Sequence, residues 1–225
     1  MIDIIVIVFL LGSALYGYRK GLLKMLVSIV ASVATILVSI VILPYINDIV
    51  RENTEIYPAV EERLEEQLEA YTSEYLEDME DEQQGNFIES MNLPKGIQKM
   101  VLKNNTAEYY KEQGISSFAQ YLSKVLAGVA IRTGIFLITY IVVFILFRVI
   151  CILAKILDHL PLIKEANHLS GMILCVAEAL IVVWLVCLAA TALSATQIGQ
   201  GMNGLIQSSR VLQILYRYNP FMLFF

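Results

Sequence analysis

The hydrophobic residues of this chain gather into four long runs separated by polar segments. The runs are Ile4–Tyr16, Leu22–Leu43, Val129–Phe147 and Met172–Ala195. Leu22–Leu43 has 22 residues and one charge, Lys24, and as a helix it would extend about 33 Å. The hydrocarbon core of a bilayer is about 30 Å thick, so each of the last three runs is long enough to cross it. The first run is shorter and would cross only with the residues after it or with local thinning of the bilayer.

This pattern predicts an all-α integral membrane protein, a bundle of about four transmembrane helices with a helical extracytoplasmic insert. We expect residues 1–43 to form a transmembrane hairpin and residues 44–128 to form the insert. Residues 129–195 would hold spans three and four with a cytoplasmic loop at 148–170, and residues 196–225 an amphipathic tail. The turn of the hairpin is placed at Gly17-Tyr18-Arg19-Lys20-Gly21.

One helix of the insert is predicted from apolar residues spaced by three and four positions, with Pro58 near its start and Gly85 just beyond its end. Acidic residues occupy its other faces and would repel one another, so the apolar stripe must pack against further helices or a partner. The stripe comprises Val60, Leu64, Leu68, Tyr71, Tyr75 and Met79.

Two more helices are expected in the insert. A break at Asn92-Leu93-Pro94 precedes a basic helix over Lys95–Lys103. A third helix is expected to start after Gly114-Ile115-Ser116 and to run directly into the third span. The sequence lacks the alternating pattern of strands and any internal repeat of fixed period.

Charge is distributed unevenly along the chain and predicts its orientation. The net charge is −5, yet the segment from Asp48 to Lys124 has 17 acidic and 7 basic side chains, while the remainder has 4 and 9. Short loops rich in Lys and Arg stay in the cytoplasm. The basic residues beside the first turn and after the third run therefore predict that these two segments face the cytoplasm and that the insert and both termini lie outside. If residues 2–18 lie at the interface instead of spanning, this orientation is inverted.

Two ionisable residues fall inside the predicted spans. Glu178 lies about seven residues into the fourth run and Arg132 lies in the third. A charge in a bilayer is costly and marks a candidate functional site. Arg132 is the obvious partner of Glu178, but the two differ by roughly 15 Å in depth along their helices. Protonation, a water-filled notch or contact with the interface would also accommodate Glu178.

Small residues recur along two of the spans and favour close packing, within the bundle or in a homo-oligomer. They are Ala31, Thr35 and Ser39, with Ser28 and Ser32 alongside, and Gly171, Cys175 and Ala179.

The sequence offers little for catalysis. His159 and His168 lack the spacing of a zinc motif, and Glu74–Glu82 lacks the central glycine and alternating oxygen ligands of a calcium loop. The three cysteines lie in or beside spans and are interpreted as packing residues. Neither basic segment is long enough for nucleic acid. We expect no catalytic, metal or cofactor site and no nucleic-acid partner.

Local matches nevertheless point to a known family. The chain has Asp3 ahead of an apolar helix, and Gly17-Tyr18-Arg19-Lys20-Gly21 ahead of a long span. Leu160-Pro161, Asn167-His168-Leu169-Ser170-Gly171 and Leu215-Tyr216-Arg217-Tyr218-Asn219-Pro220 follow. In these residues the chain resembles the CvpA (colicin V production protein) family of bacterial multi-pass membrane proteins. The resemblance covers the spans and the tail, about two-thirds of the chain, and leaves out the acidic insert.

The resemblance implies a plasma-membrane protein associated with colicin V production or export and with envelope maintenance. In the family, glycines recur after the Asn, with a basic residue among them. Cys175 and Ala179 stand at two of the glycine places and Glu178 stands near the basic one, so glycine packing and a positive charge are not carried over to this chain.

We therefore expect a non-enzymatic accessory or scaffold protein. Its partners would be the lipid bilayer, a possible second copy, and an extracytoplasmic or membrane protein. Gly17, Arg19, Lys20 and Gly21 would shape the turn, and Asn167 and Gly171 the entry to the last span, with Asn167 capping it. The alternative is an oligomeric channel or small transporter with a polar path at Glu178.

Overall fold

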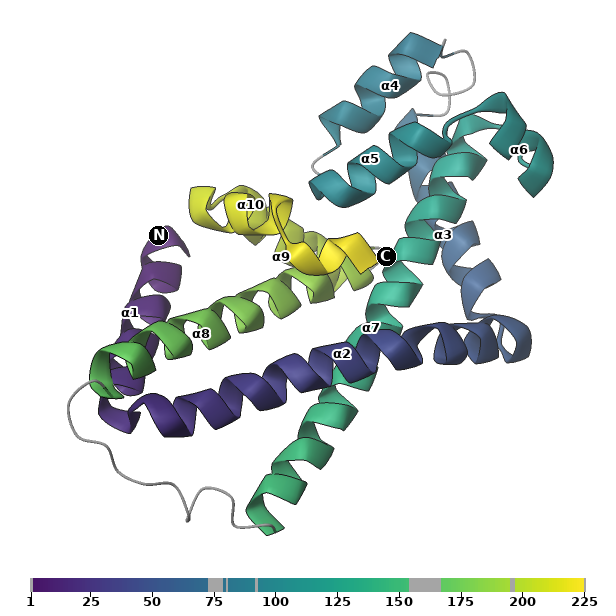
Figure 1. The fold of residues 1–225 in the computed structure, drawn as a ribbon. Helices are drawn as coiled ribbons and strands as arrows, with labels where there is room; N and C mark the ends of the chain where they lie inside the picture. The colour runs from purple at the N-terminus through teal and green to yellow at the C-terminus, as the bar shows by residue number, and fades with distance from the viewer. Residues whose placement is uncertain are drawn as a thin grey trace.

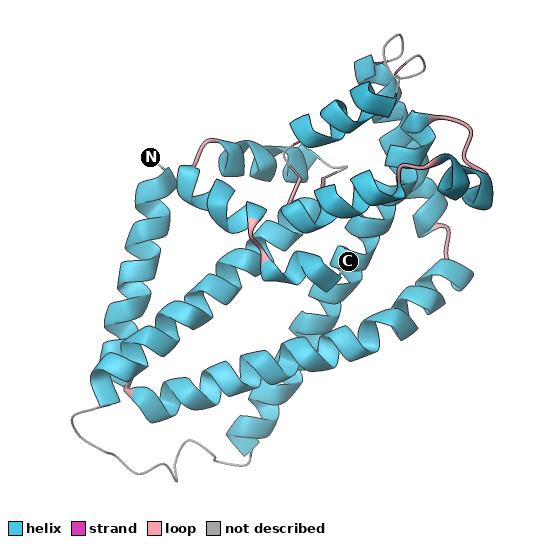
Figure 2. Cartoon of the chain, turned by 45° about the horizontal axis from the view of Figure 1, so that its top comes forward, coloured by secondary structure: helices cyan, strands magenta, loops and turns pink. Residues whose placement is uncertain are grey.

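The computed structural model describes residues 2–72, 79, 81–91, 93–153, 167–194 and 197–224. Helices joined by short loops make up this part of the chain, and it contains no strand (Figures 1 and 2). The predicted all-α class is confirmed. The elements are α1 (Ile2–Lys20), α2 (Leu22–Asn53), α3 (Ile56–Thr72), α4 (Asp81–Ser90), α5 (Lys95–Asn104), α6 (Ala107–Gln113), α7 (Phe118–Leu153), α8 (Asn167–Ala192), α9 (Gln197–Gln207), α10 (Arg210–Arg217) and the 3₁₀ helix η2 (Pro220–Phe224).

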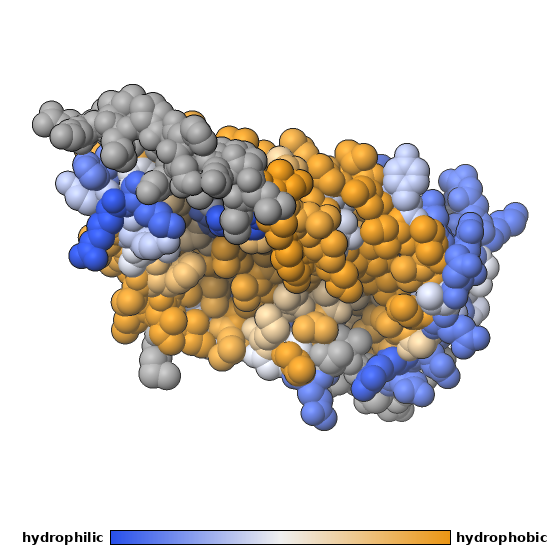
Figure 3. All heavy atoms as spheres, turned by 90° about the horizontal axis from the view of Figure 1, so that it is seen from below, coloured by the Kyte–Doolittle hydropathy of each residue, from blue (hydrophilic) through white to orange (hydrophobic). Residues whose placement is uncertain are grey.

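Within the described residues, four helices are long and apolar enough to cross a membrane, as the hydrophobic runs predict. They are α1, α2, α7 and α8, and the apolar stretches within α2 and α7 extend over Met25–Asn53 and Phe118–Ile150. The α1–α2 junction, the start of α8 and the end of α7 lie at one end of the bundle (Figure 1). The insert and the tail lie at the other. A broad apolar surface separates two polar ends (Figure 3), which is the distribution expected of a membrane bundle.

Helices α2 and α7 continue without a break from the spans into the insert. α2 has 32 residues and α7 has 36, and at 1.5 Å per residue both exceed the thickness of a bilayer core. The expected boundaries at 43/44 and 128/129 therefore fall inside helices. α7 begins at Phe118, which confirms that the helix after Ser116 runs into the third span.

The core of the insert forms where α5 packs against the first turns of α7. Ile97, Val101 and Tyr121 are almost completely buried. The Tyr121 hydroxyl donates a hydrogen bond to the carbonyl oxygen of Val101 over 2.6 Å. This bond satisfies a hydroxyl that burial would otherwise leave without a partner.

The helix limits within the insert differ in part from the prediction. α5 confirms the basic helix, which begins at Lys95. Gly85 is interior to α4 and does not follow the end of α3, so its use as a stop signal is wrong. The sequence predicts no helix over α6, because its seven residues are too few to show a periodic pattern of apolar residues. Tyr75 and most of Glu74–Glu82 lie outside the described residues, so that part of the stripe remains a prediction.

The tail folds back across the C-terminal end of α8. Tyr216 is buried, and its hydroxyl lies 3.3 Å from that of Thr191 in α8. Asn219 donates its amide to the carbonyl oxygen of Trp184 over 3.0 Å and accepts from the backbone N–H of Phe221. The tail is therefore an integral part of the bundle.

Candidate functional site

Helices α1 and α8 cross at glycines, without room for side chains. Gly17 is buried, and a Cβ at this position would overlap the Cβ of Cys175 and the carbonyl oxygen of Gly171. A Cβ on Gly171 would lie 2.6 Å from the carbonyl oxygen of Gly17 and 2.7 Å from the carbonyl carbon of Gly21. Small residues permit this approach of two backbones, which increases van der Waals contact between helices in lipid. The close packing predicted for Gly171 and Cys175 is confirmed.

The break between α1 and α2 is confined to one residue. Gly17, Arg19 and Lys20 belong to α1, and only Gly21 leaves the helical conformation, with φ of 81°. The five-residue turn predicted from Gly17 to Gly21 is therefore wrong. The positive φ is accessible to glycine without the penalty that a Cβ would bring, so a single residue is sufficient to reverse the chain.

The two basic residues of this segment lie at the C-terminal end of α1. Arg19 and Lys20 are exposed, and the Lys20 ammonium lies 4.4 Å from the ring centre of Tyr16. Positive charges are favourable at the negative end of a helix dipole. These residues can face lipid head groups or a partner without leaving the bundle.

His168 joins the start of α8 to the end of α1. Its Nδ1 lies 2.5 Å from the carbonyl oxygen of Tyr18, and the two rings lie 4.9 Å apart. Since a carbonyl only accepts, Nδ1 carries the proton. Tyr18 is in the last turn of α1, whose carbonyls lack helical partners, so the histidine satisfies one of them. Asn167 opens α8 beside it, but its side chain lies outside the described atoms, and its capping role remains a prediction.

Glu178 is bound by hydroxyl groups of α2. Its Oε1 accepts hydrogen bonds from Ser28 at 2.6 Å and from Ser32 at 3.5 Å. The Arg148 guanidinium lies 3.3 Å from the Ser28 hydroxyl and donates to it, which links α7 to the same cluster. The three helices thus share one polar network near the end of the bundle that carries the α1–α2 junction.

Arg132 lies elsewhere. Its side chain is exposed in the N-terminal half of α7, so its pairing with Glu178 is not realised, as the difference in depth suggests. From the sequence, Ser28 and Ser32 are interpreted only as small packing residues, and Arg148 is one of the basic residues that follow the third run. Whether these three side chains meet Glu178 depends on how α2 and α7 are rotated about their axes. The spacing of residues within one helix does not determine that rotation.

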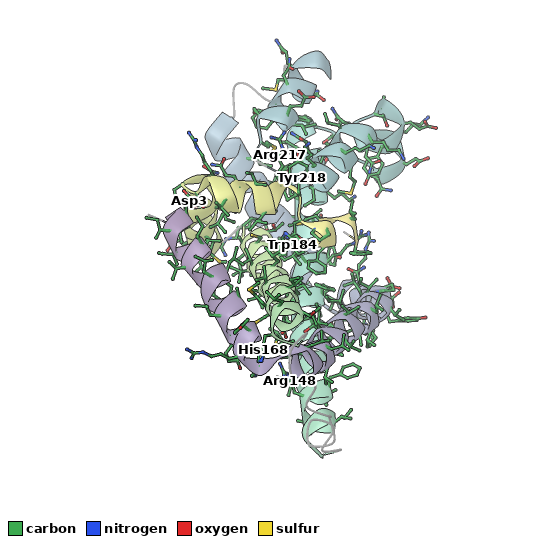
Figure 4. The ribbon with its side chains drawn as sticks, turned by 60° about the vertical axis from the view of Figure 1, so that its left-hand side comes forward. Asp3, Arg148, His168, Trp184, Arg217 and Tyr218 are labelled. Atoms are coloured by element: carbon green, nitrogen blue, oxygen red, sulfur yellow. The ribbon has the colours of Figure 1, made fainter. Side chains whose placement is uncertain are left out.

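At the other end of the bundle, Asp3 joins the first helix to the tail. Its Oδ1 accepts a hydrogen bond from the Ser209 hydroxyl at 2.7 Å and from the Val211 backbone N–H at 3.1 Å. Ser209 also caps α10 by accepting from the N–H of Leu212. The carboxylate therefore lies at a helix N-terminus, where the dipole favours negative charge. Figure 4 shows Asp3 near the tail, and His168 and Arg148 toward the opposite end.

A second link connects the tail to the insert. Lys95 at the start of α5 donates to the Tyr218 hydroxyl over 2.9 Å, and its ammonium lies 4.5 Å from the centre of that ring. This hydrogen bond lowers the pKa of Tyr218 below its ordinary value, and the positive charge of Lys95 acts in the same direction. Nearby, Gly96 lies against the backbone of Met222, where a Cβ would be 3.2 Å from the carbonyl oxygen.

A pocket of about 680 Å³ lies between the insert, the N-terminal part of α7, the C-terminal end of α8, and the tail. Its wall includes Leu126 and Val129 of α7, Thr191 of α8, and Tyr216 and Arg217 of α10. No group of three or more His, Cys, Asp or Glu side chains within the described ranges is placed to hold a metal ion.

Comparison with known proteins adds one match. A family model described as colicin V production protein matches residues 2–71 and 107–220. The unmatched segment between them contains α4 and α5. No curated protein and no solved structure matches the chain.

Proposed function

We propose that this chain, which belongs to the colicin V production protein family, is a non-enzymatic scaffold of the bacterial plasma membrane. Family membership and the four apolar helices support a membrane protein in colicin V production. The scaffold would act as an accessory to toxin production or export, or to envelope homeostasis.

The α1–α8 crossing is the observation that carries this proposal. Gly17, Gly21 and Gly171 bring two backbones together, and His168 closes the junction with a hydrogen bond to Tyr18. The residues that the sequence marks as distinctive therefore hold helices in a fixed arrangement. Such an arrangement suits a protein that presents a surface to others.

The insert is the surface that the scaffold would present. α4 and α5 lie in the segment that the family match omits. The hydrogen bond from Lys95 of α5 to the Tyr218 hydroxyl connects this segment to the tail. The proposed partner is an extracytoplasmic or membrane protein, and a second copy of the chain is a further possible occupant.

The proposed orientation follows the basic residues. Arg19 and Lys20 lie on the last turn of α1, and Arg148 lies near the same end of the bundle. The positive-inside rule favours the cytoplasm for this end. The insert and both termini would then be outside.

A second candidate function is an oligomeric channel or small transporter. It is favoured by the network of Glu178, Ser28, Ser32 and Arg148, which places hydrogen-bonding and charged groups between three spans. Polar groups of this kind line ion and proton paths in other membrane proteins.

Photo-crosslinking in intact membranes tests the scaffold proposal. A photoreactive residue replaces Glu62, which is exposed on α3, and the matched control replaces Val8, which is exposed on the apolar face of α1. We expect a protein of the export or envelope machinery to be captured from position 62 and not from position 8. Capture of lipid alone from both positions would contradict the proposed partner surface.

A further inference from the structure

The pocket between the insert and the tail has a lining that suits an amphipathic ligand. Its apolar wall comes from the ends of spans, including Leu126 and Val129, and from Ile206 of α9. Gln98, Gln213 and other polar side chains contribute hydrogen-bonding groups. The volume of about 680 Å³ lies within the range of small-molecule sites, which are mostly apolar with a few placed polar groups.

The pocket lies at the depth of lipid head groups. Val129 precedes Ile150, the inner end of the α7 span, by 21 residues, which is about 32 Å along the helix. Thr191 follows His168 on α8 by 23 residues, or about 35 Å. Both distances are close to the roughly 30 Å thickness of the hydrocarbon core. The floor of the pocket is therefore where acyl chains end and head groups begin.

Two side chains of opposite charge line the pocket. Arg217 of α10 and Glu89 of α4 both contribute to its wall and both are exposed. A guanidinium matches the oxygens of a phosphate group with two parallel hydrogen bonds. A carboxylate accepts hydrogen bonds from a primary ammonium group. One cation and one anion beside an apolar wall are complementary to a head group that carries both charges.

We propose that this pocket binds a phospholipid whose head group contains both a phosphate and a primary amine, such as phosphatidylethanolamine. Arg217 binds the phosphate, Glu89 binds the amine, and one acyl chain lies on the wall formed by Leu126 and Val129. This inference goes beyond the scaffold role and does not rest on it.

The two charges come from different parts of the chain, which divides their roles. Arg217 lies in the tail that the family match covers, whereas Glu89 lies in the unmatched segment. Phosphate binding is then assigned to the part of the chain that the family match covers. Selection of the amine is added by the insert, and the Lys95–Tyr218 contact holds the insert against the tail.

Native mass spectrometry of the full chain released from phosphatidylcholine vesicles tests the proposal. The vesicles contain added phosphatidylethanolamine or, in a parallel sample, phosphatidylglycerol. We expect wild type to retain phosphatidylethanolamine in preference to both other lipids. Arg217→Gln should lower retention of all three lipids by roughly tenfold, the usual loss for a hydrogen-bonded charge, because each of them carries a phosphate. Glu89→Gln should lower retention of phosphatidylethanolamine alone.

Matched controls remove one charge outside the pocket. Arg210→Gln, also on α10, and Glu108→Gln on α6 alter exposed residues that do not line it. Both should retain lipid as wild type does. Equal retention of the three lipids by wild type, or equal effects of the pocket and control variants, would overturn the proposal.

A second experiment uses a labelled lipid and the wild-type chain, so its result does not depend on whether a variant folds. A phosphatidylethanolamine with a photoactivatable acyl chain should label the first half of α7 and the tail, and an excess of soluble glycerophosphoethanolamine should compete poorly because it lacks acyl chains. Labelling confined to the apolar face of α1 would overturn the proposal. Full competition by the soluble head group would also overturn it. So would the detection of a bound peptide, and no bound lipid, in the protein released from vesicles.

Discussion

Gly17 and Gly171 face each other so closely that a Cβ on Gly171 would lie 2.6 Å from the carbonyl oxygen of Gly17. The obstructing atoms belong to backbone, so a side chain cannot be accommodated by a change of rotamer. Gly171→Ala should therefore push α8 away from α1 and lower the free energy of unfolding by about 1–3 kcal/mol. Thermal unfolding in detergent, followed by the fluorescence of the single tryptophan, Trp184, measures the change.

Gly12 provides the control for this substitution. It lies on α1, the helix that Gly171 of α8 contacts at Gly17, and a Cβ on Gly12 would meet nothing within 4 Å. Gly12→Ala should leave the unfolding temperature unchanged or slightly raised. Equal destabilisation by both substitutions would show that helix flexibility, and not the close crossing, accounts for the effect.

The hydrogen bond between His168 and Tyr18 predicts a graded series. His168→Phe keeps a ring against Tyr18 and removes the Nδ1 donor, so it should cost about 1 kcal/mol. His168→Ala removes both contacts and should cost more. Chemical unfolding in mixed micelles gives both values, and a Phe variant as stable as wild type would assign the contribution to ring packing.

Asp3 predicts a coupling between the first helix and the tail. Asp3→Ala removes the acceptor for Ser209 and for the Val211 N–H, so α10 should loosen from α1. We expect faster proteolysis of the tail and faster hydrogen exchange in α10 than in wild type. Asp48→Ala, which changes an exposed aspartate on α2, should leave both rates unchanged.

Tyr218 predicts a pH-dependent effect in the alkaline range. Its pKa is lowered from 10.0 mainly by the hydrogen bond with Lys95. A lowered pKa stabilises the folded state fully above the unfolded pKa, and the stabilisation is lost as the pH falls through the folded pKa. In Lys95→Met, ultraviolet titration should show one tyrosine ionising at higher pH than in wild type, and an unchanged titration would contradict the contact.

Long apolar helices are the part of the structure that sequence predicts best. Leu22–Leu43 and Met172–Ala195 are marked by length and hydropathy alone, and both lie largely within spans. Helix limits at the water boundary are less predictable because polar residues support helix beyond the bilayer. α2 thus continues to Asn53, and Gly85, a common stop signal, lies inside α4.

Contacts between distant helices are predicted least. The spacing of Gly171 and Cys175 indicates a packing face, but it does not identify Gly17 as the opposing residue. Asp3 and Ser209 are 206 positions apart, and nothing in either neighbourhood indicates that they meet. Such pairs depend on the relative rotation and depth of whole helices, which local periodicity leaves open.

Glu178 separates the scaffold proposal from the channel alternative. Glu178→Gln keeps an oxygen that can accept from Ser28 and removes the charge. A scaffold should tolerate this change, whereas a polar path for ions or protons should not. Gly17→Leu acts in the opposite way, because it disrupts the α1–α8 crossing and leaves Glu178 intact.

The most direct measurement is the release of colicin V by a producing strain in which this chain is the sole family member, with membrane level and α1–α8 crosslinking recorded for each variant. The scaffold proposal predicts that wild type and Glu178→Gln support release and that Gly17→Leu does not. Loss of release in Glu178→Gln, with membrane level and crosslinking intact, would contradict it and favour transport through the Glu178 network.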